Sequence, residues 1–268
     1  MKEKYLVMDV AKCHDCNNCF IACKDEHADN DWSPYTYAMP WHGHRWMNIE
    51  RRERGENGRV DAAFLPKPCM QCSDAPCAKA NPAFVQTRED GIVLFDLEKG
   101  AGQNITDTCP YDAIYYNDEK KVSQKCTFCA HLLDNGWEEP RCVHSCPTGA
   151  LSFYASEPAE FEKKIAEDGL SAYMDSLGTK PHVWYKNLHR FTKNFIAGQI
   201  LIDGECAAGV VVKLEGGGVT AEQKTDMFGE YKFDGLEGGE AYTATAEGKV
   251  LGKTVLTGAS VDLGEFAL

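Results

Sequence analysis

The chain has 268 residues, enough for one large domain or two smaller ones, and 43% of them are hydrophobic, so a packed core needs no special support. Its formal net charge of -13 argues against binding to nucleic acid or to an anionic membrane surface, because both require a basic protein surface. No stretch approaches the roughly 18 apolar residues of a membrane span, and no apolar segment follows the early lysines as it would in a signal peptide.

The 13 cysteines are the most informative feature of the composition. Proteins retained in the cytosol keep their thiols reduced, so their cysteines more often bind metals than form disulfides. We therefore predict a cytoplasmic protein whose cysteines are metal ligands. Export on the signal of a partner protein stays an alternative.

Twelve of the cysteines form four groups within a first domain, which we predict over residues 1–155. In chain order the groups are Cys13-x2-Cys16-x2-Cys19-x3-Cys23, Cys69-x2-Cys72-x4-Cys77, Cys109-Pro110, and Cys126-x2-Cys129-x12-Cys142-x3-Cys146-Pro147. The first group has the spacing of a bacterial ferredoxin loop without its terminal proline. In such a loop three cysteines hold one [4Fe–4S] cluster, and the fourth ligates a neighbouring cluster.

This cross-ligation rule divides the twelve cysteines into three complete ligand sets. The predicted sets are Cys13, Cys16, Cys19 and Cys146 for cluster 1, Cys126, Cys129, Cys142 and Cys23 for cluster 2, and Cys69, Cys72, Cys77 and Cys109 for cluster 3. Structural zinc is the alternative, because C-x2-C pairs also occur in zinc ribbons. Zinc requires neither the ferredoxin run nor the Cys-Pro ends, so the pattern favours iron–sulfur ligation.

An internal repeat indicates a pseudo-twofold, ferredoxin-like domain. Residues 8–13 resemble residues 95–100, with Gly100 in the place of Cys13, and residues 109–114 resemble residues 146–151. The second loop has thus lost its three cysteines. Its remote partner is missing too, because Asn81-Pro82 stands where the cross-ligation rule expects Cys-Pro. The absent residues make up one whole ligand set, so the sequence predicts three clusters and not four.

The rest of the chain predicts a helix and connector over 156–196 and a β domain over 197–268. Residues 157–165 open with a proline and acidic residues, as the first turn of a helix does. The tail alternates apolar and polar residues between glycine-rich turns, which predicts short antiparallel strands in a small β-sandwich. The predicted fold class is α+β.

Three further features have competing interpretations. Six histidines near the cysteine loops either donate hydrogen bonds to cluster sulfurs or are polar surface: His14, His27, His42, His44, His131 and His144. The mixed-charge run Arg45–Arg54 reads as a strand that faces either a partner or solvent. Cys206 has no predicted role. The chain lacks nucleotide-binding, metalloprotease and hydrolase motifs, so we predict no catalytic residue on it.

The order of the four cysteine groups resembles that of the iron–sulfur subunits of the dimethyl sulfoxide reductase family. Within that family, four segments resemble small subunits of transhydroxylases that act on phenols such as pyrogallol and phloroglucinol: Val10–Phe20, Gly43–Gly55, Lys125–Asp134 and Tyr185–Leu188. The segment Thr225–Phe233 is similar to transthyretin-like and carboxypeptidase-regulatory-like domains. The departure from the family is the missing fourth ligand set.

The resemblance implies a large catalytic partner with molybdenum on two molybdopterin guanine dinucleotides, and substrates that are polyhydroxylated aromatics. The chain would then transfer electrons within a molybdenum hydroxytransferase or oxidoreductase without being catalytic itself. A reductive catechol dehydroxylase, a phenol hydroxylase or another molybdenum oxidoreductase are alternatives for the complex, and an external electron donor or acceptor is a further partner. A different class of role is structural: in a redox-neutral complex the clusters would chiefly hold the shape of the protein.

Overall fold

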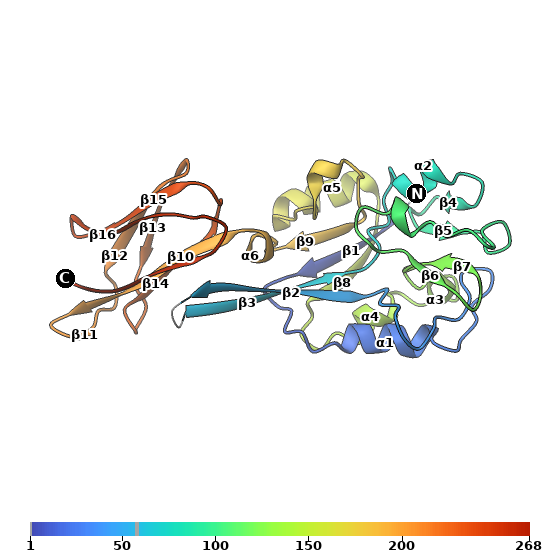
Figure 1. Ribbon diagram of the computed structural model, residues 1–268, viewed down its shortest axis with the longest axis horizontal. Helices are drawn as coiled ribbons and strands as arrows, with labels where there is room; N and C mark the ends of the chain where they lie inside the picture. The colour runs from blue at the N-terminus through green and yellow to red at the C-terminus, as the bar shows by residue number, and fades with distance from the viewer. Residues whose placement is uncertain (1, 57–58) are drawn as a thin grey trace. The chain divides into compact units, whose positions relative to one another are not determined.

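The computed structural model describes residues 2–56 and 59–268, and the chain forms two compact units (Figure 1). Unit 1 comprises Met1–Glu50 and Phe64–Leu188, and unit 2 comprises Arg51–Ala63 and His189–Leu268. The two-stranded sheet of β2 (Asn48–Glu56) and β3 (Arg59–Lys67) therefore belongs partly to each unit. The chain returns to unit 2 at His189, earlier than Ala197, where the sequence predicted the β domain to begin.

Unit 1 is built on a three-stranded sheet in the order β8 (Leu151–Ser156), β1 (Glu3–Asp9) and β9 (Val183–Lys186). Strand β1 runs antiparallel to β8 and parallel to β9. Helix α5 (Pro158–Asp168) has proline in its first turn and ends at Gly169, which takes the left-handed conformation that glycine adopts at little cost. Its Phe161 ring stacks on Tyr5 of β1, so the helix covers one face of the sheet (Figure 1).

The rest of unit 1 consists of short elements that carry the cysteine loops. The helices are α1 (Asn18–His27), α2 (Pro76–Ala80), α3 (Ala130–Leu133) and α4 (Arg141–His144), with 3-10 turns at Thr106–Thr108 and Asp175–Leu177. The strand pairs are β4 (Val85–Thr87) with β5 (Val93–Phe95), and β6 (Tyr115–Asn117) with β7 (Val122–Gln124), both antiparallel. Such short elements have little regular structure of their own, so their loops depend on tertiary contacts for support.

Unit 2 has one helix, α6 (His189–Thr192), and two four-stranded sheets among its described residues. One sheet contains β10 (Asn194–Ile202), β11 (Glu205–Cys206), β14 (Glu230–Leu236) and β17 (Val261–Ala267), and the other contains β12 (Val211–Gly216), β13 (Val219–Lys224), β15 (Ala241–Ala246) and β16 (Lys249–Val255). Side chains from both sheets share one apolar core that includes Ile196, Leu214 and Tyr242. The prediction that all strands are antiparallel was wrong for β17, which pairs parallel to β10.

The structure divides the run Arg45–Arg54 into buried and exposed side chains. The side chain of Arg54 is 0% exposed and donates to the carboxylates of Asp61 and Asp234, at 2.5 and 2.8 Å. Arg52 donates to the backbone oxygens of Phe191 and Lys193. Arg54 is thus bound inside unit 2, whereas Arg51 and Glu53 of the same strand are exposed, so part of the run faces solvent.

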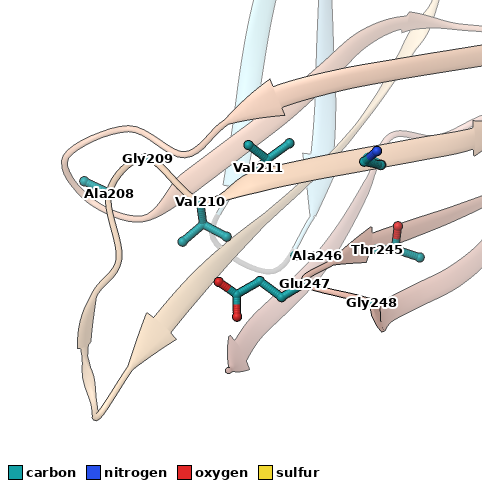
Figure 2. Close-up of a pocket in the computed structure, with 9 residues that line it drawn as sticks. Ala208, Gly209, Val210, Val211, Thr245, Ala246, Glu247 and Gly248 are labelled. Atoms are coloured by element: carbon teal, nitrogen blue, oxygen red, sulfur yellow. The ribbon is translucent and has the colours of Figure 1, made fainter.

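A shallow pocket of unit 2 lies at the turn after β15 (Figure 2). Figure 2 shows Val210, Val211 and Glu247 beside it. Its lining residues, all within the described part of the chain, include Lys213 and Glu247 as the only charged side chains. Lys213 is already paired with Glu222 at 2.7 Å, so the pocket offers no cluster of reactive groups.

Candidate metal centres

The loop of the first set curves tightly before α1. Asp15 and Asn17 both have positive φ, and the Asn17 amide donates to the backbone oxygen of Asp15, which fixes the turn between the cysteines. Cys16 is exposed, Cys13 is half-buried and Cys19 is buried. The fourth residue, Cys146, is close enough for its charge to raise the pKa values of Cys13 and Cys19, although burial is the larger cause for both. The structure thus brings the first predicted set together.

The pKa of Cys146 is lowered, whereas the pKa values of Cys13 and Cys19 in the same set are raised. Burial raises the pKa of Cys146, but a hydrogen bond from the Thr148 side chain and bonds from the backbone N–H groups of Leu151, Ala150 and Thr148 outweigh burial and lower it. Cys109 receives bonds from the N–H groups of Tyr111 and Ala113, at the equivalent positions after its own Cys-Pro. Both Cys-Pro turns therefore present a sulfur to backbone donors, which stabilise the thiolate that a metal requires.

The second set lies in the interior of unit 1. Phe128 and Cys129 both have positive φ, and the Phe128 N–H lies 3.4 Å from the Cys126 sulfur. Cys142 comes from α4, which packs against α1, the helix that carries Cys23. Burial raises the pKa of Cys23 well above its usual range, and the neighbouring charges of Cys126 and Cys129 raise it further. The four sulfurs of this set are therefore close neighbours.

All four cysteines of the third set line one cavity, together with Tyr111 and Lys125. Burial, followed by the charge of Cys69, raises the pKa of Cys72 to about 12, while a hydrogen bond with the Thr179 side chain acts in the opposite direction. Tyr111 shares a 2.7 Å hydrogen bond with the same Thr179 hydroxyl. The ammonium of Lys125 donates to the backbone oxygens of Val93 and Cys126, and so ties this cavity to the loop of the second set. Sequence reasoning missed these supports, because no motif marks them.

The electrostatic effects between cysteines of different sets show which sets are neighbours. The charge of Cys69, from the third set, raises the pKa of Cys126 in addition to the larger effect of burial. The charge of Cys19, from the first set, is among the causes that raise the pKa values of Cys23 and Cys142, after burial and the thiols of their own set. The second set therefore lies between the other two.

The chemistry of these donors fits a cationic group. Most of the twelve thiols are buried beside other thiols, so without a metal their thiolate forms are disfavoured by burial and mutual repulsion. Bound iron would reverse this effect by supplying positive charge. Within residues 2–56 and 59–268, no three His, Cys, Asp or Glu side chains converge on one point as the ligands of a single ion do.

The region of the missing fourth set is filled by protein. A Cβ atom at Gly100 would lie 2.9 Å from the backbone oxygen of Asp96 and 3.0 Å from the Phe84 ring, so a cysteine there requires rearrangement. The Asn81 amide donates to the backbone oxygen of Cys77 at the end of α2. The turn before Gly100 nevertheless repeats the first loop, because Asp96 accepts from the N–H of Glu98 as Asp9 accepts from the N–H of Ala11.

The six histidines divide into buried and exposed groups. His27, His44 and His131 are buried, whereas His14, His42 and His144 are exposed. The His27 Nε2 atom lies 3.8 Å from the Cys129 sulfur, and the His27 ring packs against the rings of Trp46 and His131. Burial lowers the pKa of His27 to about 3, so the ring is neutral at ordinary pH. Of the six, His27 is thus the one that the structure places against a cysteine sulfur.

Known proteins identify the family. A family model for the 4Fe-4S dicluster domain matches residues 60–156. The small subunit of pyrogallol hydroxytransferase from Pelobacter acidigallici is 51% identical and aligns over 100% of both chains. A protein from Halobacterium salinarum, named for the iron–sulfur subunit of a dimethyl sulfoxide reductase, is 30% identical over 68% of this chain and 78% of its own. This protein belongs to the iron–sulfur subunits of the dimethyl sulfoxide reductase family.

Membership confirms that the protein is an iron–sulfur electron-transfer subunit with [4Fe–4S] clusters. A polysulfide reductase component from Wolinella succinogenes is 31% identical over 69% of this chain and 94% of its own. A solved 9R-lipoxygenase from Cyanothece, 12% identical over 47% of this chain and 21% of its own, has a TM-score of 0.20, too low to indicate a shared fold. The described helices include none that is long and apolar enough to cross a membrane.

Proposed function

We propose that the chain is the electron-relay subunit of its complex and holds three [4Fe–4S] clusters on the predicted twelve cysteines. When bound, such clusters accept and donate single electrons. The observation that carries the proposal is the arrangement of the thiols: three neighbouring groups of four in succession, of which the third lines a cavity of its own. The recurrence of the Cys-Pro and aspartate turns supports the proposed pseudo-twofold repeat.

The exposure of the thiols indicates which set lies nearest the protein surface. Cys16 of the first set is exposed, whereas Cys129 of the second set and Cys72 of the third are buried. Transfer between proteins is fastest where the redox group is close to the surface, so the first set is the proposed contact with a partner. The second set then connects it to the third.

The proposed partner is a large catalytic subunit with molybdenum on two molybdopterin guanine dinucleotides. The full-length similarity to the small subunit of a pyrogallol hydroxytransferase supports this partner and supports polyhydroxylated aromatics as substrates. A complex that removes a hydroxyl group from a catechol, or hydroxylates a phenol, would use the same subunit and also an external electron donor or acceptor. A cytoplasmic location stays a prediction.

We further propose that residues 1–155 form the cluster domain, 156–196 the connector and 197–268 a β-sandwich of the transthyretin or carboxypeptidase-regulatory kind. Support comes from the apolar core that the two four-stranded sheets share. The turn Asp226–Gly229 adds to it, since Asp226 accepts from the N–H groups of Phe228 and Glu230. A solved structure of this segment with a single-sheet arrangement would contradict the proposal.

The test of the cluster count is the iron and acid-labile sulfide content of anaerobically purified protein. Three cubanes require about twelve of each per chain. About eight of each would show that one set is not occupied, and the set lining the cavity could then be checked by substitution of Cys72. Zinc in place of iron would overturn the electron-transfer role.

Replacing His27 by phenylalanine is expected to make one cluster harder to reduce. A cysteine sulfur bound to iron only accepts hydrogen bonds, so His27 would donate from Nε2 to Cys129, and losing a donor to a cluster sulfur destabilises the reduced form. The measurement is the midpoint potential in an anaerobic redox titration followed by electron paramagnetic resonance. His27→Gln, which keeps an N–H donor, is the matched control. Equal potentials in the wild type and in His27→Phe would contradict the assignment.

A further inference from the structure

Unit 1 holds a pocket of about 440 Å³ beside the third set of cysteines. Its apolar wall is aromatic: the rings of Tyr5 and Phe161 stack with centroids 3.8 Å apart, and Trp184 meets Phe161 edge-on at 6.5 Å. Ile165 of α5 lines the same wall. Pockets of this size accommodate small ligands, and an aromatic wall favours a flat ring.

The pocket is also lined by polar residues. His182 Nε2 lies 3.0 Å from the Ser73 hydroxyl oxygen and 3.3 Å from a Glu3 carboxylate oxygen, which also accepts from the Tyr5 hydroxyl. The His182 ring fits closely against Gly91, where a Cβ atom would lie 1.9 Å from Cε1. Lys180 lines the pocket from an exposed position. The polar lining therefore offers one ammonium donor, Lys180, and carboxylate acceptors from Glu3, Glu162 and Asp175.

The polar lining is connected to the third set of cysteines. Ser73 directly follows Cys72 in the chain, and its N–H donates to the backbone oxygen of Lys180 at 2.9 Å. The N–H of Asp74 donates to the backbone oxygen of Thr179, whose side chain hydrogen-bonds with the Cys72 thiol. A ligand that touches Ser73 is thus one residue away from a proposed cluster ligand.

We propose that this pocket binds a planar quinone or hydroquinone that exchanges electrons with the iron–sulfur group of the third set. The inference rests on the proposed function, because it names the external donor or acceptor of that relay. The aromatic wall takes the ring, Lys180 donates to a quinone oxygen, and Glu3 accepts the proton of a hydroxyl group.

The exchange balances as follows in the direction of hydroquinone oxidation. Two O–H bonds break, and two protons pass to the Glu3 carboxylate in turn and from there to solvent. The two electrons would leave one at a time, the first to the iron–sulfur group that the third set would hold and on to a second proposed group, and the other to the group of the third set. Quinone reduction is the same process in reverse.

The experiment uses the full chain, purified anaerobically with its iron, and menadione as the probe. Equilibrium dialysis measures binding, and stopped-flow absorbance measures how fast menadione oxidises the reduced clusters. Ile165→Trp places a large ring in the pocket, and Lys163→Trp adds the same ring at an exposed position of α5 that does not line the pocket. Lys180→Ala is a second test that leaves the apolar wall intact.

We expect saturable binding of menadione and an oxidation rate that saturates with its concentration. Ile165→Trp should weaken binding and lower the rate by about tenfold or more, whereas Lys163→Trp should change neither. No binding, a rate that rises linearly without saturation, or equal effects of the two tryptophans would overturn the inference. If the purified chain contains no iron, the proposed function is overturned before any quinone is added. If the chain contains iron but neither binds menadione nor is oxidised by it in a saturable way, only this inference is overturned.

Discussion

Serine in place of Cys126 is expected to remove the proposed middle cluster and, if the proposed three clusters are present, about four of the roughly twelve irons per chain. Cys126 is half-buried and close to Cys69 of the third set, and the thirteenth cysteine, Cys206, belongs to unit 2. A serine hydroxyl gives up its proton far less readily than a thiol, so it is a poor ligand for iron. Iron analysis and electron paramagnetic resonance of the reduced protein measure the loss.

Cys206→Ser is the matched control for this substitution. Cys206 is exposed in unit 2 and belongs to no predicted set, so its replacement should leave iron, sulfide and spectra unchanged. An unchanged iron content in Cys126→Ser would contradict the ligand assignment.

The same variant separates a relay from a structural role of the clusters. If electrons cross the chain, losing the middle cluster should abolish reduction of the first set by a donor that acts at the third. If the Cys126→Ser complex stays assembled and keeps full catalytic activity without that cluster, the clusters chiefly maintain structure. Activity of the purified complex, measured beside its iron content, decides between the two.

Replacing Arg54 by methionine is expected to destabilise unit 2 by about 3 kcal/mol, because it leaves two carboxylates without the buried cation between them. Arg54 is buried and bonds Asp61 and Asp234. Lys232 still bonds Asp61, which keeps the expected cost at the lower end of the range for broken buried pairs. Amide hydrogen exchange of β10 and β14 in the full chain measures the change as a loss of protection of about a hundredfold.

Lys213→Met is the control, because Lys213 and its partner Glu222 are each 55% exposed on the same unit. Exposed ion pairs contribute little to the free energy of unfolding, so the protection of amide hydrogens against exchange should not change measurably. Equal protection in wild type and Arg54→Met would show that the buried charges are not a stabilising contact.

The same contact predicts how the stability of unit 2 depends on pH. Burial alone would raise the pKa of Asp61, but hydrogen bonds from Lys232 and Arg54 outweigh it and lower the pKa from 3.8 to about 2. A lowered pKa in the folded state stabilises the protein above the unfolded value, near pH 4, and this stabilisation is lost as the pH falls through about 2. The slope over this interval should be shallower in Arg54→Met than in the wild type.

Local features of the chain predicted much of the candidate site, because cysteine spacing is a property of neighbouring residues. The ferredoxin run from Cys13 to Cys23 and the Cys-Pro at Cys146 indicated the family, which the comparisons then confirmed. The proline at the start of α5 likewise marked a helix that the structure contains. The division of twelve cysteines among three clusters stays a prediction until iron is counted.

Long-range contacts were beyond the reach of those patterns. His27 meets Cys129 across 102 residues, and Arg54 meets Asp234 across 180 residues, so no local period encodes either contact. The parallel pairing of β17 with β10 escaped prediction for the same reason, since an alternating strand pattern does not reveal the direction of its neighbour.

By itself, then, the sequence determined the kind of cofactor, the residue type of the ligands and the family, because these depend on which side chains occur at short intervals. Only the tertiary structure decided the order of the three sets in space, the burial of Arg54 and the pocket beside Cys72. These features arise where segments far apart in the chain pack together, and their energy comes from burial and charge pairing that exist only once the chain has folded.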